Sequence, residues 1–241
     1  MKKIVMCGLF TCFCASSIYA MEQSKKDNVQ ILRTLVEDAK RIFVQKKSFP
    51  MLIGIAGCSA VGKSFFAEEF AELLRQKKLR TAILHCDDFL DPDYYDKDNF
   101  HPYFQHERAH AFLQRILSGE LLVEKPRWNP LDQRPPAKVM EYFSLIGVQS
   151  VLFEGEFATS DVEPYNFRKY VDLSVFVDAK DDHILRWNWS RAREVKEKTE
   201  AEFFANNRPY LQKYRAFVSA SRAADYVVSK DANHRYTLKK S

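Results

Sequence analysis

A loop of eight residues, placed between an apolar strand and an amphipathic helix, constrains this chain more than any other stretch. Residues 51–56 are apolar apart from one glycine, which is typical of a buried parallel strand. Residues 57–64, Gly-Cys-Ser-Ala-Val-Gly-Lys-Ser, match the spacing G-x-x-x-x-G-K-[ST]. Apolar residues then recur with helical period through residues 64–79. This order of strand, loop and helix predicts a phosphate-binding loop.

Each residue type in the loop has a physical role in phosphate binding. Glycines let the backbone turn so that successive N–H groups point inward, and the following helix presents the positive end of its dipole. The Lys63 side chain supplies a cation for the β- and γ-phosphates, and the Ser64 hydroxyl can bind Mg²⁺. We therefore predict that a nucleotide binds here. The predicted cofactor-binding residues of this segment are Gly57, Cys58, Ser59, Ala60, Val61, Gly62, Lys63, Ser64 and Phe65.

Two further apolar segments are predicted strands that each end at an acidic residue. Residues 80–86 lead to Asp87. Residues 148–153 lead to Glu154. In open α/β sheets ligands bind at the carboxyl ends of the strands, so we expect both carboxylates beside the loop. Asp87 could accept a proton from an attacking hydroxyl or hold Mg²⁺ through water, and Glu154 could anchor Mg²⁺ with Ser64. The alternative is that Asp87 caps a helix or a turn.

Residues 171–177 and 225–229 predict a fourth and a fifth strand. A helix follows the fourth strand and carries Arg186, Arg191 and Arg193. A basic helix that closes on the nucleotide would neutralise the charge of a transferring phosphoryl group. We therefore predict that Arg186 contacts the nucleotide and that Arg191 and Arg193 are catalytic. The alternative is a basic face that only contacts solvent.

Taken together, these motifs resemble the uridine kinase and phosphoribulokinase branch of the P-loop kinases, which also holds nicotinamide riboside kinases and bacterial-type pantothenate kinases. The resemblance covers residues 51–228. Besides the phosphate-binding loop it rests on His85–Phe89, Phe100–Pro102, Leu113–Glu120, Pro126–Asn129, Val151–Gly155, Leu173–Arg193, Arg208-Pro209 and Ala224-Asp225.

The resemblance implies an α/β P-loop NTPase fold, in which helices enclose a mostly parallel sheet of about five strands. It also implies a substrate-side hairpin and a helical lid. The implied activity is ATP-dependent phosphorylation of a hydroxyl on a small molecule. Asp87 would be the base, Lys63 and the lid arginines would bind the phosphoryl charge, and Ser64 with Glu154 would hold Mg²⁺.

The chain departs from the family pattern on the acceptor side. Tyr103 follows the His-Pro element, where uridine-type kinases carry a carboxylate that holds the ribose hydroxyls. Trp128 and Asn129 stand where those kinases have a Tyr–Asp pair. A lost charge-assisted hydrogen bond weakens ribose binding by about 1.5–3 kcal/mol. The acceptor therefore stays open between a nucleoside and a similar metabolite.

The first twenty residues have the layout of a secretory signal. Lys2 and Lys3 precede an apolar run at residues 4–14, and small residues lead to Ala20. The run is too short for a stable membrane span. We therefore predict a signal at 1–20, an amphipathic helix at 21–50 and a kinase domain at 51–241, with export to the periplasm or the medium. The alternative is a cytoplasmic protein that starts at Met21. An exported chain would also fit a second function, a nucleotide-binding switch or effector that hydrolyses ATP slowly or not at all.

Composition sets limits on partners. The 241 residues are 46% hydrophobic, enough for one sizeable core, and the net charge of +5 is not gathered in one block. We therefore predict a small-molecule substrate and no nucleic-acid partner. The oligomeric state stays open.

Beyond residues 1–20 the cysteines are Cys58 and Cys86. We expect two small buried side chains, with a disulfide between them as the alternative.

Overall fold

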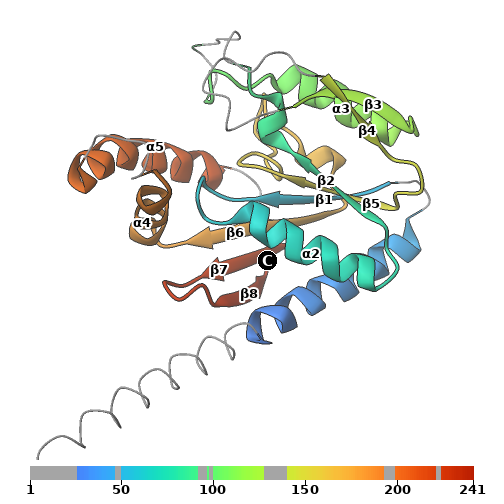
Figure 1. Ribbon diagram of the computed structural model, residues 1–241, viewed down its shortest axis with the longest axis horizontal. Coiled ribbons are helices and arrows are strands. Elements are labelled where there is room, and N and C mark those ends of the chain that lie inside the picture. The colour runs from blue at the N-terminus through green and yellow to red at the C-terminus, as the bar shows by residue number, and fades with distance from the viewer. Residues whose placement is uncertain are drawn as a thin grey trace, which may run out of the picture.

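The computed structural model describes residues 26–46, 50–91, 97, 100–127, 140–192, 199–220 and 224–241 (Figure 1). The predicted signal at 1–20 lies outside these residues, as do Trp128, Asn129 and Arg193. No helix within the described ranges has the length and apolar character needed to cross a membrane.

A six-stranded sheet with the order β2-β5-β1-β6-β7-β8 forms the centre of the fold (Figure 1). The strands are β1 (Met51–Ala56), β2 (Thr81–His85), β5 (Ser150–Glu154), β6 (Leu173–Ala179), β7 (Tyr226–Lys230) and β8 (Tyr236–Lys240). The first five strands in this order pair in parallel, and β8 pairs antiparallel to β7. All five predicted strands are present, and the predicted mostly parallel sheet is confirmed.

The sheet has one strand beyond the five that the sequence indicated. This strand, β8, is a polar edge strand in which only Tyr236 is buried. Strand β5 lies between β1 and β2. Its placement pairs His85 of β2 with Glu154 of β5 in the register. Because β5 is the direct neighbour of β1, its last residue, Glu154, lies next to the loop that follows β1.

The central strand β1 is apolar at almost every position because both faces of the sheet are covered. Met51, Ile53 and Ile55 pack into a core that lies on the side of α2 (Lys63–Gln76). Leu52 and Ala56 point the other way. The alternation follows the two-residue period of a strand.

The α2-side core is completed by helices from both halves of the chain. Residues 26–45 form a helix that runs on the same side of the sheet as α2 (Figure 1) and buries Leu32, Leu35, Val36 and Ala39. It thus has the amphipathic character expected for residues 21–50. Helices α4 (Asp181–Ala192) and α5 (Glu200–Ala220) pack at the carboxyl edge of the sheet, where a helical lid was predicted.

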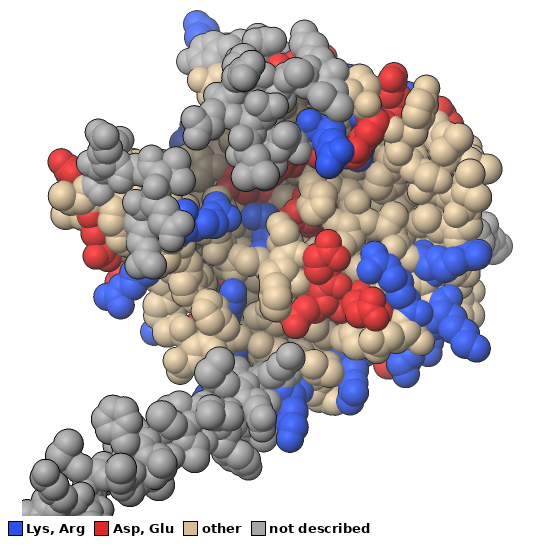
Figure 2. Space-filling view, in the orientation of Figure 1, with Lys and Arg blue, Asp and Glu red and all other residues tan. Residues whose placement is uncertain are grey.

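The charged side of α2 faces solvent. Figure 2 shows it as a patch of acidic side chains over this helix, to which the exposed residues Glu68 and Glu72 belong. The buried side holds Phe66, Ala67, Phe70, Ala71 and Leu74.

The other face of the sheet carries α3 (His106–Leu117) and an antiparallel hairpin of β3 (Leu122–Pro126) and β4 (Met140–Ser144). This hairpin confirms the predicted one. Short 3₁₀ helices, η1 (Cys86–Phe89) and η2 (Arg168–Tyr170), precede α3 and β6.

The segment that leads from η1 to α3 belongs partly to the core. Phe104 is buried, and its ring contacts those of Phe157, Tyr165 and Phe167. Phe100 packs against Phe217 at a ring distance of 5.2 Å. The segment is therefore anchored at its end by aromatic packing. Residues 92–96 and 98–99 lie outside the described residues.

Asp225 connects the start of β7 to the start of β6. Its carboxylate accepts hydrogen bonds from the Ser174 N–H and from Ser174 Oγ, both at 2.8 Å, and from the Arg168 guanidinium at 3.1 Å. The Asp225 N–H in turn donates to Ser174 Oγ at 2.9 Å. A single carboxylate thus fixes the offset between two parallel strands.

We expect Asp225→Ala to lower the free energy of unfolding by about 1.5–3 kcal/mol, the range for hydrogen bonds to charged groups. Urea denaturation followed by circular dichroism would measure the change. Glu124→Ala, which removes an exposed carboxylate on the hairpin, is the matched control. Equal stability of the two variants would contradict the structural role of Asp225.

Candidate active site

The phosphate-binding loop connects β1 to α2 and follows a path that requires glycine at two positions. Gly57 has φ 153°, and a Cβ there would lie 2.3 Å from the Val177 carbonyl oxygen of β6. Gly62 has φ 96°, in the left-handed region. Because Gly57 packs closely against β6, the loop lies directly over the carboxyl edge of the sheet.

A positively charged group lies over the centre of the phosphate-binding loop. Lys63 Nζ donates a hydrogen bond to the Cys58 carbonyl oxygen at 3.1 Å, so the ammonium group lies over the loop. No side chain caps the N-terminus of α2, and its first turn holds no acidic residue. The N–H groups of that turn are therefore available to an anion. Phe65, in the same turn, is 62% exposed.

Glu154, at the end of β5, brings the loop and β2 together. Its Oε1 accepts a hydrogen bond from Ser64 Oγ at 3.0 Å and one from His85 Nδ1 at 2.6 Å. Burial alone would raise the pKa of the Glu154 carboxyl, but the hydrogen bond from His85 and the charge of Lys63 lower it below its ordinary value. Glu154 is therefore ionised at neutral pH. A hydroxyl and a carboxylate are oxygen donors of the kind that Mg²⁺ prefers, so the predicted metal residues fit the ion.

Asp87 lies in η1, directly after β2, on the same edge of the sheet. Its side chain reaches solvent, but surrounding protein raises the pKa of the Asp87 carboxyl above its ordinary value. Lys63 is close enough to oppose that shift, and Glu154 is close enough to add to it. These electrostatic contacts place Asp87 next to the phosphate-binding groups, as expected.

Asp88, the neighbour of Asp87, takes part in a buried ion pair. Lys125 Nζ of β3 lies 2.7 Å from Asp88 Oδ2 and 2.6 Å from Glu141 Oε1 of β4. The Lys125 and Asp88 side chains are 6% and 8% exposed. Asp88 therefore ties the hairpin to η1 and so positions Asp87. Sequence reasoning did not predict this pairing, because its three members are far apart in the chain.

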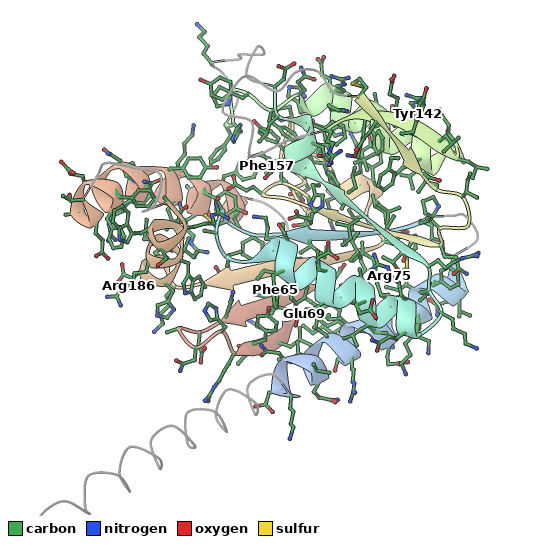
Figure 3. The ribbon with its side chains drawn as sticks, in the orientation of Figure 1. Phe65, Glu69, Arg75, Tyr142, Phe157 and Arg186 are labelled. Carbon is green, nitrogen blue, oxygen red and sulfur yellow. The ribbon has the colours of Figure 1, made fainter. Side chains whose placement is uncertain are left out.

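A small cavity opens beside Asp87, with a volume of about 160 Å³. It is lined by Ser59, Cys86, Asp87, Leu90, His101, Phe104, Glu156 and Phe157. Ser59 belongs to the phosphate-binding loop, so the cavity lies between that loop and the α3 side of the sheet. Figure 3 labels Phe157 in this region. An acceptor molecule in the cavity would lie within reach of Asp87.

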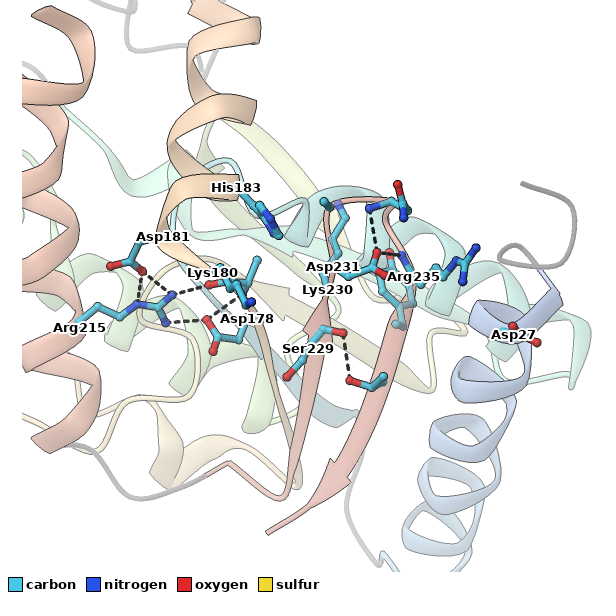
Figure 4. Close-up of a pocket in the computed structure, with 15 residues that line it drawn as sticks. Asp27, Asp178, Lys180, Asp181, His183, Arg215, Ser229, Lys230, Asp231 and Arg235 are labelled. Atoms are coloured by element: carbon cyan, nitrogen blue, oxygen red, sulfur yellow. Dashed lines mark hydrogen bonds and ion pairs between the residues drawn. The ribbon is translucent and has the colours of Figure 1, made fainter. Parts of the chain in front are cut away.

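A larger groove of about 870 Å³ opens between the start of α4 and the β7–β8 turn (Figure 4). Lys230, the last residue of β7, lines it and donates from Nζ to the Val61 carbonyl oxygen at 3.2 Å. The same Nζ lies 4.7 Å from the ring centre of Trp187. Trp187 stacks on His234 with ring centres 4.9 Å apart. Sequence reasoning missed Lys230, since it lies far from the loop in the chain.

Of the predicted lid arginines, Arg186 points away from the phosphate-binding loop (Figure 3). Arg186 is exposed, and Figure 3 shows its side chain pointing outward from α4. Arg191 is also exposed, near the end of α4, and Arg193 lies outside the described residues. Their roles stay predictions. Arg215 of α5, which we did not predict, instead binds the edge of the sheet (Figure 4), with Nη1 2.5 Å from Asp178 Oδ1.

Cys58 and Cys86 are both free and buried, as expected. Burial raises the pKa of the Cys58 thiol to about 12, so it is protonated at neutral pH. The structure thus favours two small buried thiols over the disulfide alternative.

Comparisons with known proteins support the resemblance that the sequence predicted. No protein-family model matches the sequence. The chain is 25% identical over 214 residues to a pantothenate kinase of Sinorhizobium fredii, which covers 77% of this chain and 62% of the relative. It is 28% identical over 192 residues to a pantothenate kinase of Streptomyces coelicolor, covering 73% and 56%. The chain therefore spans less than two thirds of the length of these relatives.

A solved structure from Silicibacter sp. TM1040, described as a fructose transport system kinase, superimposes with a TM-score of 0.68 at 15% identity. The match covers 81% of this chain and 98% of that one. The chain thus has the fold of the P-loop kinases, as predicted. The predicted resemblance to this group, bacterial-type pantothenate kinases included, is confirmed.

We expect Lys125→Met to lower the free energy of unfolding by about 3–5 kcal/mol, because it removes the ammonium group that is paired with the buried Asp88 carboxylate. The double variant Asp88→Asn/Lys125→Met also removes the buried negative charge and should recover part of that loss. Urea denaturation of Lys125→Met, Asp88→Asn and the double variant would measure the difference. A double variant as unstable as the sum of two single losses would contradict the pairing.

Proposed function

We propose that this protein transfers the γ-phosphoryl group of ATP to a hydroxyl of a small metabolite. The observation that supports this most strongly is the convergence of three groups at one edge of the sheet. The phosphate-binding loop with Lys63, the Ser64–Glu154 pair and Asp87 come from three different parallel strands and the loops that follow them. Phosphoryl transfer needs these same elements, which position the two substrates and stabilise charge.

In the proposed reaction the acceptor oxygen attacks the γ-phosphorus. A new P–O bond forms, the bond from that phosphorus to the β,γ-bridging oxygen breaks, and ADP leaves with the electron pair. Asp87 takes the proton of the acceptor hydroxyl. Lys63 and the N-terminus of α2 bind the phosphate oxygens. Bound at Ser64 and Glu154, Mg²⁺ would neutralise phosphate charge.

A groove on the side of the loop opposite the small cavity has room for the base of the nucleotide. The groove of about 870 Å³ adjoins the loop through Lys230. Lys230 also contacts the ring of Trp187, which stacks on His234 outside the lining of the groove. We propose that the adenosine of ATP extends into this groove. The acceptor then approaches from the smaller cavity, so that the two substrates meet between Lys63 and Asp87.

The alternative function is a nucleotide-binding switch with slow or no hydrolysis. The cavity beside Asp87 favours transfer over this alternative, because a switch needs no room for a second substrate. Acceptor-dependent formation of ADP distinguishes the two, since a switch would release ADP at the same rate with and without acceptor.

We expect Asp87→Asn to lower acceptor-dependent turnover by about 100- to 10,000-fold, the usual contribution of a general base. ATP binding should be unchanged, because the loop that holds the phosphates is intact. Turnover is measured by ADP release and ATP affinity by titration calorimetry. Asp161→Asn, outside the cavity, is the control, and full activity of Asp87→Asn would refute the assigned role.

The raised pKa of Asp87 predicts the pH dependence of catalysis. The carboxylate accepts a proton only when ionised, so kcat/KM should fall as pH drops through this pKa. The acid limb should therefore lie above the value of about 4 typical of an aspartate. A pH profile of kcat/KM, beside one of ATP affinity, tests this. A profile that stays flat down to about pH 4 would contradict the environment assigned to Asp87.

A further inference from the structure

The cavity beside Asp87 carries a second carboxylate, that of Glu156, which no motif assigns. Glu156 lies two residues after Glu154, in the turn that follows β5. The Glu154 carboxylate binds Ser64, whereas Glu156 lines the cavity. Asp87 and Glu156 line the same small cavity, so their carboxyl groups face one shared space.

Contacts from α5 hold Glu156 in place. Tyr210 donates its hydroxyl hydrogen to Glu156 Oε2, and the Tyr214 hydroxyl donates to the Glu156 backbone carbonyl at 3.0 Å. Within the part of the chain that the structure describes, Oε1 of Glu156 has no hydrogen-bond partner. One oxygen is thus fixed by the protein, and the other is available to a ligand in the cavity.

His101 adds a further acceptor or donor at the same place. Its Nδ1 is buried and has no hydrogen-bond partner among the described residues. Burial lowers the pKa of its imidazole, so the ring is neutral at neutral pH. The backbone N–H of His101 donates to the Tyr165 hydroxyl at 3.0 Å, which holds the backbone of this residue beside the cavity.

The charges of the cavity select against an anion. Among the described residues that line it, Asp87 and Glu156 are acidic and none is a lysine or an arginine. Lys63 is occupied on the phosphate side. A carboxylate or phosphate on the acceptor would face two like charges, with no compensating cation among the described lining residues. Hydroxyl groups, in contrast, donate hydrogen bonds to carboxylates.

The size of the cavity points to a compact ligand. Its volume of about 160 Å³ equals that of about five water molecules in the liquid. Leu90, Phe104 and Phe157 supply apolar walls that suit the carbon face of such a molecule. The volume suits a short carbon chain or ring with several hydroxyls, or the reacting end of a longer molecule.

We propose that the acceptor is a charge-neutral, polyhydroxylated molecule, a sugar, a polyol or the ribose of a nucleoside, and that Glu156 determines this specificity. The inference rests on the proposed kinase function and names its substrate class. One acceptor hydroxyl gives its proton to Asp87 and attacks the γ-phosphorus of ATP as described above. A second hydroxyl donates to Glu156 Oε1, which sets the orientation of the first.

The test is an acceptor screen with the full chain, MgATP and measurement of ADP, with each product identified by mass. Neutral acceptors are ribose, fructose, ribitol, glycerol and uridine. Anionic acceptors of similar size are gluconate, glycerate, pantothenate and ribulose 5-phosphate. We expect turnover with at least one neutral acceptor, at a higher kcat/KM than with any anionic one.

The variant Glu156→Gln separates specificity from catalysis. We expect it to raise KM for the neutral acceptor about tenfold or more, the effect of losing a charge-assisted hydrogen bond, with a much smaller change in kcat. It should also raise kcat/KM for the acid that matches the neutral acceptor. Glu72→Gln on the exposed side of α2 is the control.

Glu156 also contacts α5, so two measurements guard against a purely structural effect. Thermal unfolding of Glu156→Gln reports whether the fold is intact. Tyr210→Phe removes the hydrogen bond from α5 but keeps the carboxylate, and should leave the preference for neutral acceptors in place. A Tyr210→Phe variant that accepts anions as well as Glu156→Gln does would refute the role of the carboxylate.

The possible failures can be told apart. If an anionic acceptor has the highest kcat/KM, the protein is a kinase but the proposed acceptor class is wrong. If no acceptor of either class stimulates ADP release, the proposed kinase function fails, and the acceptor assignment fails with it. If a neutral acceptor is phosphorylated but Glu156→Gln leaves its KM unchanged, the role of Glu156 is refuted.

Discussion

The buried carboxylate of Glu154 accepts hydrogen bonds from the helix that follows β1 and from the end of β2, the two strands on either side of β5. Ser64 belongs to the first turn of α2, and His85 belongs to the end of β2. A buried charge is costly unless it is paired, so the three groups stabilise one another only when β5 lies between β1 and β2. The strand order and the geometry of the site therefore depend on the same interaction. Asp87, two residues after His85, is placed by it as well.

Local patterns predicted that the loop, Asp87 and Glu154 lie at one edge of the sheet, where the structure has them. The Gly57–Ser64 spacing, the apolar run of β1 and the acidic residue after each of two strands are short-range signals, and a parallel sheet brings such strand ends to one edge. The length of a strand and its burial follow from its own residues. This is why five of the strands were found and the edge strand β8, with only Tyr236 buried, was not.

Contacts between residues that are far apart in the chain produce no such short-range pattern in the sequence. Lys125 meets Asp88 only because the hairpin folds back on η1, and Lys230 at the end of β7 reaches Val61 past the intervening strand β6. The order of strands is likewise a property of the complete sheet. Glu156 could have been noticed from its spacing of two after Glu154, but whether its side chain faces the cavity depends on the turn after β5. The acceptor side is built mainly from contacts of this kind, which explains why the family pattern alone left it open.

The groove for the proposed nucleotide site is bordered by parts of the chain that are very far apart in sequence. The Asn28 side chain donates to the His234 carbonyl oxygen at 2.9 Å and accepts from the Tyr236 N–H at 2.7 Å, a separation of more than 200 residues. Such contacts close the longest loops and so form late in folding. A partly folded chain can hold a finished phosphate-binding loop and still lack this wall of the groove. Affinity for the complete nucleotide would then report the last stage of folding, while affinity for inorganic phosphate would report an earlier one.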